Sequence, residues 1–183
     1  MKNIRNKVTL ISILLLILVL CVNYESIERR FYPIEYSNYV EHYSEKYNVD
    51  KYLVYSVIKT ESKFNPDAVS RKGASGLMQI TDLTASWAAK ELKINGNVDI
   101  HNPETNIMIG TWYLSRLEKE FDGDLHLVIS AYNGGSGNVR KWLKSPKYSN
   151  DGKSLKSIPF KETSQYTEKV LKNYRKYKEL YNR

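Results

Sequence analysis

The residue whose type and position best suit chemistry is Glu61. The apolar residues Val54, Val57 and Ile58 recur at helical spacing, and Glu61 occupies the next position of the same stripe. The pattern therefore predicts a carboxyl group on the buried side of a helix. Burial disfavours the ionised form, which raises the pKa towards the value that a general acid needs near neutral pH. The alternative, from the stripe alone, is a helix-end glutamate that faces solvent or caps a loop.

The elements that would position this carboxyl group are predicted to be helical throughout, because no strand-like alternation of useful length occurs. Asp50, Asn102 and Asp124 have side chains typical of N-caps, and Pro103 suits a first helical position. Helices are expected at residues 37–47, 51–65, 82–92, 103–122, 125–132, 139–143 and from about 163 onwards. Glycines predict a loop at 71–80, a chain reversal at 133–137 and a mobile loop that ends near Pro159. The expected fold class is all-α.

The N-terminus has the pattern of an export signal or a membrane anchor. Three basic residues precede the uncharged run from Val8 to Val22. As a helix, this run would span roughly 22 Å, against about 30 Å for a bilayer core, so its length does not separate the two alternatives. No small-x-small cleavage site follows, which favours an uncleaved anchor with its basic flank in the cytoplasm and the remaining chain outside.

Cys21 raises the alternative of a lipoprotein, since a cysteine after an apolar run can be lipidated. Leu20 precedes it, where lipoproteins have Gly or Ala, so we favour a small apolar residue within the anchor. Cys21 is the only cysteine, which excludes a disulfide framework and a cysteine metal site. The expected organisation is a signal or anchor at 1–23, a connector at 24–36 and a folded domain at 37–183.

Composition and charge limit the partners. The chain has 183 residues, 42% apolar and 12% aromatic, which fits one globular domain. The net charge is +8, and it is +5 without the three basic residues that precede the apolar run. The surplus lies between Arg140 and Lys178 and suits an anionic wall or membrane surface, although most of these lysines fit a solvated helix face. Without a nucleic-acid motif, we expect no nucleic-acid partner.

Four ordered motifs carry a resemblance to a known family. They are Glu61-Ser62, Gly-Leu-Met-Gln-Ile at 76–80, Ala-Tyr-Asn-Gly-Gly at 131–135 and Glu162-Thr163-x-x-Tyr166. Their order and spacing resemble the soluble-lytic-transglycosylase (SLT) domain, a branch of the goose-type lysozyme-like superfamily. The resemblance implies an all-α lysozyme-like fold with a groove for peptidoglycan. It also implies non-hydrolytic cleavage of the β-1,4 bond between N-acetylmuramic acid and N-acetylglucosamine, which leaves 1,6-anhydromuramyl ends.

The resemblance also implies a set of site residues. Glu61 would be the acid and then the base, without metal or cofactor, because the substrate supplies the remaining groups. The substrate-binding residues would be Ser62, Met78, Gln79, Tyr132, Asn133 and Tyr166.

Several of these assignments have a plainer alternative. Ser62 could bond the helix backbone, and Tyr166 could pack in a stripe of tyrosines. Of the two tyrosines, Tyr132 is expected to approach the carboxyl group of Glu61. Glu162 is better explained as a helix-start residue, and we expect Asp67 and Asp82 to be structural.

Two other functions compete with the transglycosylase. A lysozyme on the same fold would use water in place of the substrate's C6 hydroxyl and would need a second carboxylate. A cell-wall binding module would keep the fold without turnover. For all three we expect a monomer that contacts peptidoglycan strands outside the cell membrane.

Overall fold

The structure is a computed structural model of the chain that describes residues 6, 10, 13, 15, 17–19, 22–94, 96 and 98–182. The chain divides into two units, Met1–Pro33 together with Arg183, and Ile34–Asn182.

The first unit contains α2 (Tyr24–Phe31), none of whose residues is buried. The hydroxyl of Tyr24 donates a hydrogen bond of 2.9 Å to Glu28, one helical turn further on. The predicted connector at 24–36 is therefore helical over much of its length, because side chains one turn apart can stabilise an exposed helix.

The predicted membrane anchor falls mostly outside the described residues. Among those that are described, no helix has the length and apolar character needed to cross a membrane. Cys21 is not among the described residues. The anchor, its cleavage and its lipidation therefore stay predictions.

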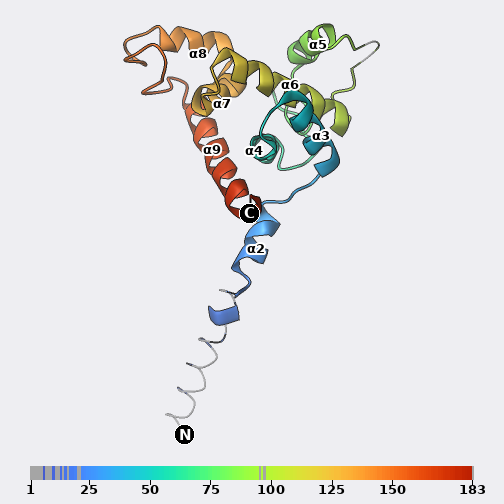
Figure 1. Cartoon of the computed structure of the whole chain (residues 1–183), viewed down its shortest axis with the longest axis vertical. Helices are drawn as coiled ribbons and strands as arrows, with labels where there is room; N and C mark the ends of the chain where they lie inside the picture. The colour runs from blue at the N-terminus through green and yellow to red at the C-terminus, as the bar shows by residue number, and fades with distance from the viewer. Residues whose placement is uncertain are drawn as a thin grey trace. The chain divides into compact units, whose positions relative to one another are not determined.

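The second unit is built from helices (Figure 1). In chain order these are α3 (Ser37–Tyr47), α4 (Lys51–Glu61), α5 (Asp82–Glu91), α6 (Pro103–Glu120), α7 (Leu125–Gly134), α8 (Ser136–Leu143) and α9 (Lys161–Tyr181). Within the described residues, extended pairing is limited to isolated bridges from Ser75 to Val69 and to Ile80. The all-α prediction is confirmed for this part of the chain.

Three helices begin at the predicted capping residues. The side chains of Asp50, Asn102 and Asp124 each accept a hydrogen bond from a backbone N–H two or three residues further on, at 2.8 to 3.1 Å. Each cap satisfies a donor that the first helical turn leaves unpaired. The starts of α4, α6 and α7 are thus fixed by local sequence.

Other predicted boundaries were wrong by a few residues. The chain reversal at 133–137 reduces to a break at Gly135, which has a φ of +83° between α7 and α8. The loop before α9 folds around the carboxylate of Asp151, which accepts hydrogen bonds from the backbone N–H groups of Lys153 and Ser154 at 2.8 Å each. Such side-chain bonds to neighbouring backbone form a turn without regular secondary structure.

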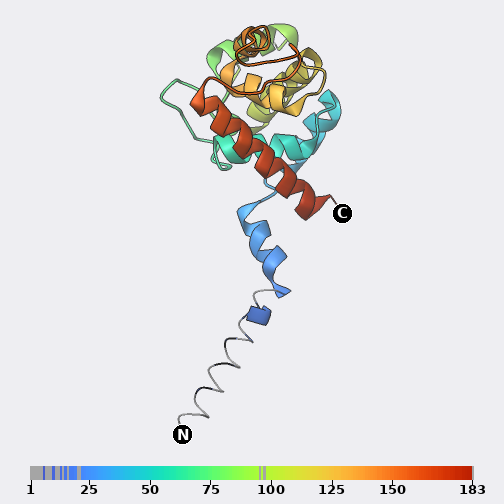
Figure 2. The ribbon, with the colours of Figure 1, turned by 90° about the vertical axis from the view of Figure 1, so that its left-hand side faces the viewer.

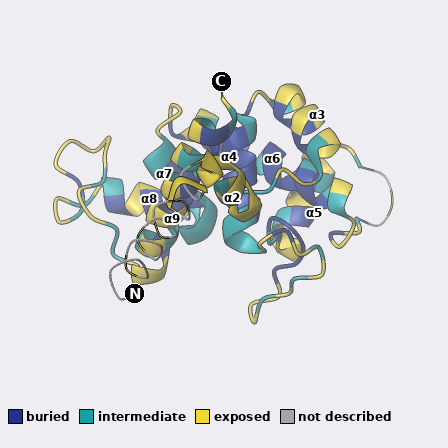
Figure 3. Cartoon of the chain, turned by 90° about the horizontal axis from the view of Figure 1, so that it is seen from below, coloured by how far each residue is buried: buried dark blue, intermediate teal, exposed yellow. Residues whose placement is uncertain are grey.

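Helix α4 lies in the interior and forms the centre of the core (Figure 3). Leu53, Val54, Val57 and Ile58 have no exposed surface. Helix α9 runs along α4 and also packs against α7 (Figure 2). A helix buried on all sides holds its last residue, Glu61, in a fixed position relative to the neighbouring helices.

The tyrosines of α9 set its position along α4. The buried ring of Tyr177 stacks on Tyr55 with centroids 5.6 Å apart. The hydroxyl of Tyr174 donates a 2.7 Å hydrogen bond to Asp50, the N-cap of α4. These contacts fix the position of α9, and Tyr166 therefore reaches the opposite end of α4.

The loop at 71–80 is held by one buried side chain, Asn106 on α6. It accepts a hydrogen bond from the N–H of Met78 at 2.7 Å and donates to the carbonyls of Ser75 and Ile100 at 2.9 and 2.7 Å. Gly76 allows this close packing, since a Cβ there would lie 2.8 Å from the carbonyl oxygen of Ile100. The loop that carries the second motif is therefore tied to α6.

Gly110 on α6 permits a close approach, and its neighbour is Met78. A Cβ at Gly110 would lie 2.9 Å from the Cβ of Met78. Met78 itself has no exposed surface. Its side chain belongs to the core.

We predict that Asn106→Ala destabilises the protein by about 2 to 4 kcal/mol, because it leaves buried backbone groups without partners. The expected result is a lower midpoint of urea unfolding. Thr105→Ala, a substitution next to it on α6, serves as the control. Equal midpoints for the two variants would contradict the importance given to Asn106.

Candidate active site

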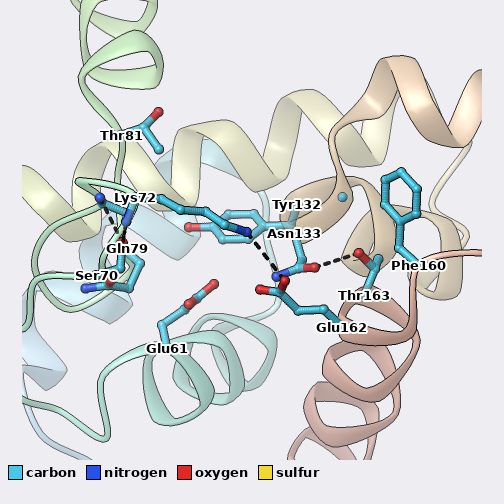
Figure 4. A pocket seen from close by; sticks show the side chains of 12 residues that line it. Glu61, Ser70, Lys72, Gln79, Thr81, Tyr132, Asn133, Phe160, Glu162 and Thr163 are labelled. Atoms are coloured by element: carbon cyan, nitrogen blue, oxygen red, sulfur yellow. Dashed lines mark hydrogen bonds and ion pairs between the residues drawn. The ribbon is translucent and has the colours of Figure 1, made fainter.

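Glu61 is the last residue of α4, where the chain leaves the core. Its carboxyl group points from α4 towards a pocket (Figure 4). The pocket has a volume of about 430 Å³ and is lined by Glu61, Ser70, Lys72, Ala74, Gln79, Thr81, Tyr132, Asn133, Gly134, Phe160, Glu162 and Thr163. The second, third and fourth motifs thus meet around the end of α4.

Burial raises the pKa of Glu61 to about 7, and the nearby carboxylate of Glu162 acts in the same direction. A hydrogen bond from Tyr166 and the positive charge of Lys169 oppose this rise. The main cause is loss of water around the charged form. A carboxyl group with this pKa can both give and take a proton near neutral pH.

The tyrosine that bonds Glu61 is Tyr166. Its hydroxyl donates to Oε1 of Glu61 at 2.7 Å. The sequence predicts that Tyr132 approaches the same carboxyl group, but the Tyr132 hydroxyl donates to the backbone carbonyl of Met78 at 2.8 Å and not to Glu61. Tyr132 still lines the pocket, and Glu61 contributes to raising its pKa, after the larger effect of burial. The two tyrosines therefore differ in function: one bonds the acid and the other forms a wall.

Gln79 and Asn133 line the pocket as expected, each held at one end of its amide. The nitrogen of Gln79 donates to the carbonyls of Ala68 and Gly76 at 2.9 and 3.0 Å. The oxygen of Asn133 accepts a 2.8 Å hydrogen bond from Thr163 (Figure 4). Gln79 can therefore offer an acceptor to a ligand and Asn133 a donor.

Ser62 and Met78 do not line the pocket. The hydroxyl of Ser62 donates to the carbonyl of Ile58 and accepts from the N–H of Phe64, both at 3.1 Å. This is the backbone-bonding alternative that the sequence allowed. Met78 is buried over Gly110, and its backbone carbonyl supports Tyr132. Both residues therefore support the residues that line the pocket and do not line it themselves.

A pair of charged side chains that is not among the predicted site residues lies at the rim of the pocket. Lys72, from the loop, and Glu162, from the first turn of α9, form an ion pair of 3.4 Å whose side chains are 82% and 72% exposed (Figure 4). The fourth motif contained Glu162, but its place at a helix start also explained it. Lys72 carried no signal, since loop lysines are usually solvated.

Two carboxyl groups, Glu61 and Glu162, are among the residues that line the pocket. Asp67 and Asp82 are exposed and outside its lining. Within the described part of the chain, no three His, Cys, Asp or Glu side chains come close enough to form a metal site. The lining therefore offers one buried acid, one exposed carboxylate, amides and an aromatic wall.

Comparisons with known proteins identify relatives of this chain. The chain is 36% identical over 152 residues to the soluble lytic murein transglycosylase of Escherichia coli, covering 81% of this chain and 23% of that protein. It is 34% identical over 158 residues to the membrane-bound lytic murein transglycosylase C of Yersinia pestis, covering 72% of this chain and 44% of that protein. The chain thus spans about a quarter to under half of the length of these relatives.

Solved structures show the same fold. The 70 kDa soluble lytic transglycosylase of Escherichia coli superimposes with a TM-score of 0.73 at 33% identity, over 81% of this chain and 25% of that one. An inactive Glu-to-Gln mutant of the lytic transglycosylase Slt from Pseudomonas aeruginosa gives a TM-score of 0.72 at 29% identity, over 82% and 25% of the two chains.

The family model of the transglycosylase SLT domain matches residues 38–155, which include Glu61 and most of the pocket lining. This match covers more than half of the chain. The chain therefore belongs to the transglycosylase SLT domain family.

Proposed function

We propose that this chain is a peptidoglycan lytic transglycosylase that cleaves the bond between N-acetylmuramic acid and N-acetylglucosamine without water. The observation that carries the proposal is Glu61, a desolvated carboxyl group with a pKa of about 7 at the edge of a polar pocket. The relatives that share the SLT domain are named lytic murein transglycosylases.

In the first step, protonated Glu61 donates its proton to the glycosidic oxygen while the bond from that oxygen to C1 of the muramic acid breaks. The leaving sugar departs as a neutral alcohol. The muramic acid's 2-acetamido group stabilises the positive charge that develops at C1. Proton transfer by a positioned carboxyl group contributes typically 10²- to 10⁴-fold to such a rate.

In the second step, the Glu61 carboxylate takes the proton of the C6 hydroxyl as that oxygen attacks C1. The new bond closes the 1,6-anhydro ring, and Glu61 is protonated again. One carboxyl group completes the cycle because the substrate provides the nucleophile. The hydrogen bond from Tyr166 keeps the carboxyl group oriented in both steps.

Three pocket residues would orient the sugars. Gln79 would accept a hydrogen bond from a hydroxyl or acetamido N–H, and Asn133 would donate one to an acetamido oxygen. Tyr132 would provide an apolar wall next to Glu61. Ser62 and Met78 would act on the substrate only through the elements that they support.

A lysozyme-type hydrolysis is the second candidate, because Glu162 places another carboxylate in the pocket lining. Inverting or retaining hydrolysis needs such a group to activate water or to act as the nucleophile. Glu162 is exposed and its carboxylate is paired with Lys72, so this carboxylate is not held in place to activate a water or to attack the sugar. The non-hydrolytic route is therefore preferred.

We further propose that the catalytic domain acts in the cell envelope, outside the membrane, as a monomer. The apolar run at 8–22 and the basic residues before it support an anchored form. The relatives' names include both soluble and membrane-bound enzymes. The proposal of an anchored form therefore rests on the N-terminal sequence of this chain and not on the names of its relatives.

The full chain should release muropeptides with anhydromuramyl ends from purified peptidoglycan, and Glu61→Gln should lower the rate at least 10²-fold with the fold retained. Mass spectrometry before and after borohydride reduction distinguishes the products, because anhydro ends resist reduction. Reducible ends would indicate a lysozyme. No release would support a binding module, and a Glu61→Gln variant as active as the original chain would reject Glu61 as the acid.

Two variants should move the alkaline limb of the pH–activity profile in opposite directions. Activity requires protonated Glu61, so it falls as the pH rises through the pKa of that group. Tyr166→Phe removes a donor that stabilises the carboxylate, which should raise this pKa and shift the limb upward. Glu162→Gln removes a negative charge that raises the pKa, so its limb should shift downward. Shifts of the same sign in kcat/KM profiles would contradict this account.

Glu61→Gln should make the protein more stable at pH 8 but not at pH 4. The pKa of Glu61 is about 7 when folded, above its ordinary value of 4.5. As the pH rises from 4.5 to 7, the unfolded chain loses this proton first, and the folded state loses about 2 to 3 kcal/mol relative to it. Urea unfolding at both pH values measures the difference. Glu91→Gln, at an exposed position of α5 that does not contribute to the pKa shift of Glu61, serves as the control and should show little change at either pH.

A further inference from the structure

A second groove lies on α5, α6 and α8, and we call it the Trp87 groove. Its volume is about 500 Å³, and it is lined by Trp87, Tyr113, Arg116, Leu117, Lys119, Glu120, Ser136 and Arg140. None of these residues lines the Glu61 pocket.

Two continuous pieces of chain contribute residues both to the Glu61 pocket and to this groove. Thr81, the N-cap of α5, lines the pocket, and Trp87 on the same helix lines the groove about 9 Å further along the helix axis. On the other side, Gly134 at the end of α7 lines the pocket, and Ser136 at the start of α8 lines the groove. The two sites thus share these pieces of chain.

A pair of tyrosines connects the two sites. Tyr132 lines the pocket and Tyr113 lines the groove, and their ring centroids are 5.4 Å apart. A long ligand leaving the Glu61 pocket over this pair would enter the Trp87 groove.

The groove has an aromatic surface open to solvent. Trp87 is 38% exposed, although it packs edge-on against Trp112 at 4.8 Å and against Tyr113 at 6.0 Å. These contacts hold the indole in place and leave part of it free. A fixed, partly exposed indole offers a large apolar face at little cost in conformational entropy, which suits stacking on the apolar face of a sugar ring.

The groove is also positively charged. Arg140 pairs with Glu120 at 2.8 Å, which neutralises the only carboxylate in its lining. The guanidinium of Arg116 lies 5.9 Å from the Trp87 ring centroid, and Lys119 lies one turn from Arg116 on α6. Within the described residues, no carboxylate lies at ion-pair distance from Arg116 or Lys119. A ligand that combines sugar rings with carboxylates fits both features.

We propose that the Trp87 groove binds the continuation of a peptidoglycan strand beyond the cleavage site, with a sugar on Trp87 and the carboxylates of a peptide stem on Arg116 and Lys119. The proposal rests on the proposed function. Binding in the Trp87 groove would make the enzyme favour long strands with peptide stems over short strands and over strands without stems.

The test measures binding of glycan strands to the full chain carrying Glu61→Gln, which prevents cleavage, by isothermal titration calorimetry. The probes are long strands with peptide stems and the same strands after amidase removes the stems. Adding Trp87→Ala should weaken both by about tenfold, the effect of losing one anchoring aromatic residue. Adding Arg116→Gln with Lys119→Gln should weaken stem-bearing strands about threefold to tenfold and leave stripped strands unchanged.

Matched controls are Leu83→Ala and Lys90→Gln, exposed residues of α5 that line neither site. Circular dichroism confirms folding, and if Trp87→Ala unfolds, Trp87→Phe and the double charge variant carry the test. If the Trp87 variant and the double charge variant bind both probes with the same affinities as the controls, the proposed strand binding in the Trp87 groove is wrong. A chain with intact Glu61 that releases anhydro products would in that case leave the proposed function standing, whereas no release would reject both.

Discussion

The structure depends on one costly arrangement, a carboxyl group kept at the end of a largely buried helix, where Tyr166 is its hydrogen-bond donor among the described residues. Glu61 gains one bond from Tyr166 and loses most of its water, so its pKa rises to about 7. A second strong donor would lower this value and leave less of the carboxyl group protonated near neutral pH. A more exposed position would do the same.

This arrangement requires α9 to be held accurately along α4. Asp50 caps the start of α4 and, through its other carboxylate oxygen, accepts the hydroxyl of Tyr174 on α9. Tyr177 stacks on Tyr55 in the middle of the same interface. The two helices are therefore joined at several levels, and Tyr166 arrives at Glu61 as a consequence of packing far from the site.

Other groups that line the pocket differ from Glu61 because they are exposed to solvent and therefore accessible to a ligand. Glu162 is solvated and paired with Lys72, while Glu61 is desolvated, so the two carboxyl groups have opposite properties although they share one pocket. This difference in environment supports the proposal that Glu61 is the proton donor. Beyond Tyr132 the surface becomes aromatic and basic, which suits a long anionic ligand.

The sequence by itself determined what depends on near neighbours. Asp50, Asn102 and Asp124 were predictable caps, because each bonds a backbone N–H within three residues. The apolar stripe of α4 indicated Glu61 by periodicity, and the ordered motifs indicated the family.

Only the tertiary structure decided which distant side chains meet. Tyr166 rather than Tyr132 bonds Glu61, across 105 positions of sequence, and Asn106 holds Met78 across 28. Met78 belongs to the core, and Lys72 stands opposite Glu162 because a loop and a helix start converge on one pocket. Such pairings depend on the register of packed helices, and one helical turn of sliding would exchange the partners without changing any local pattern.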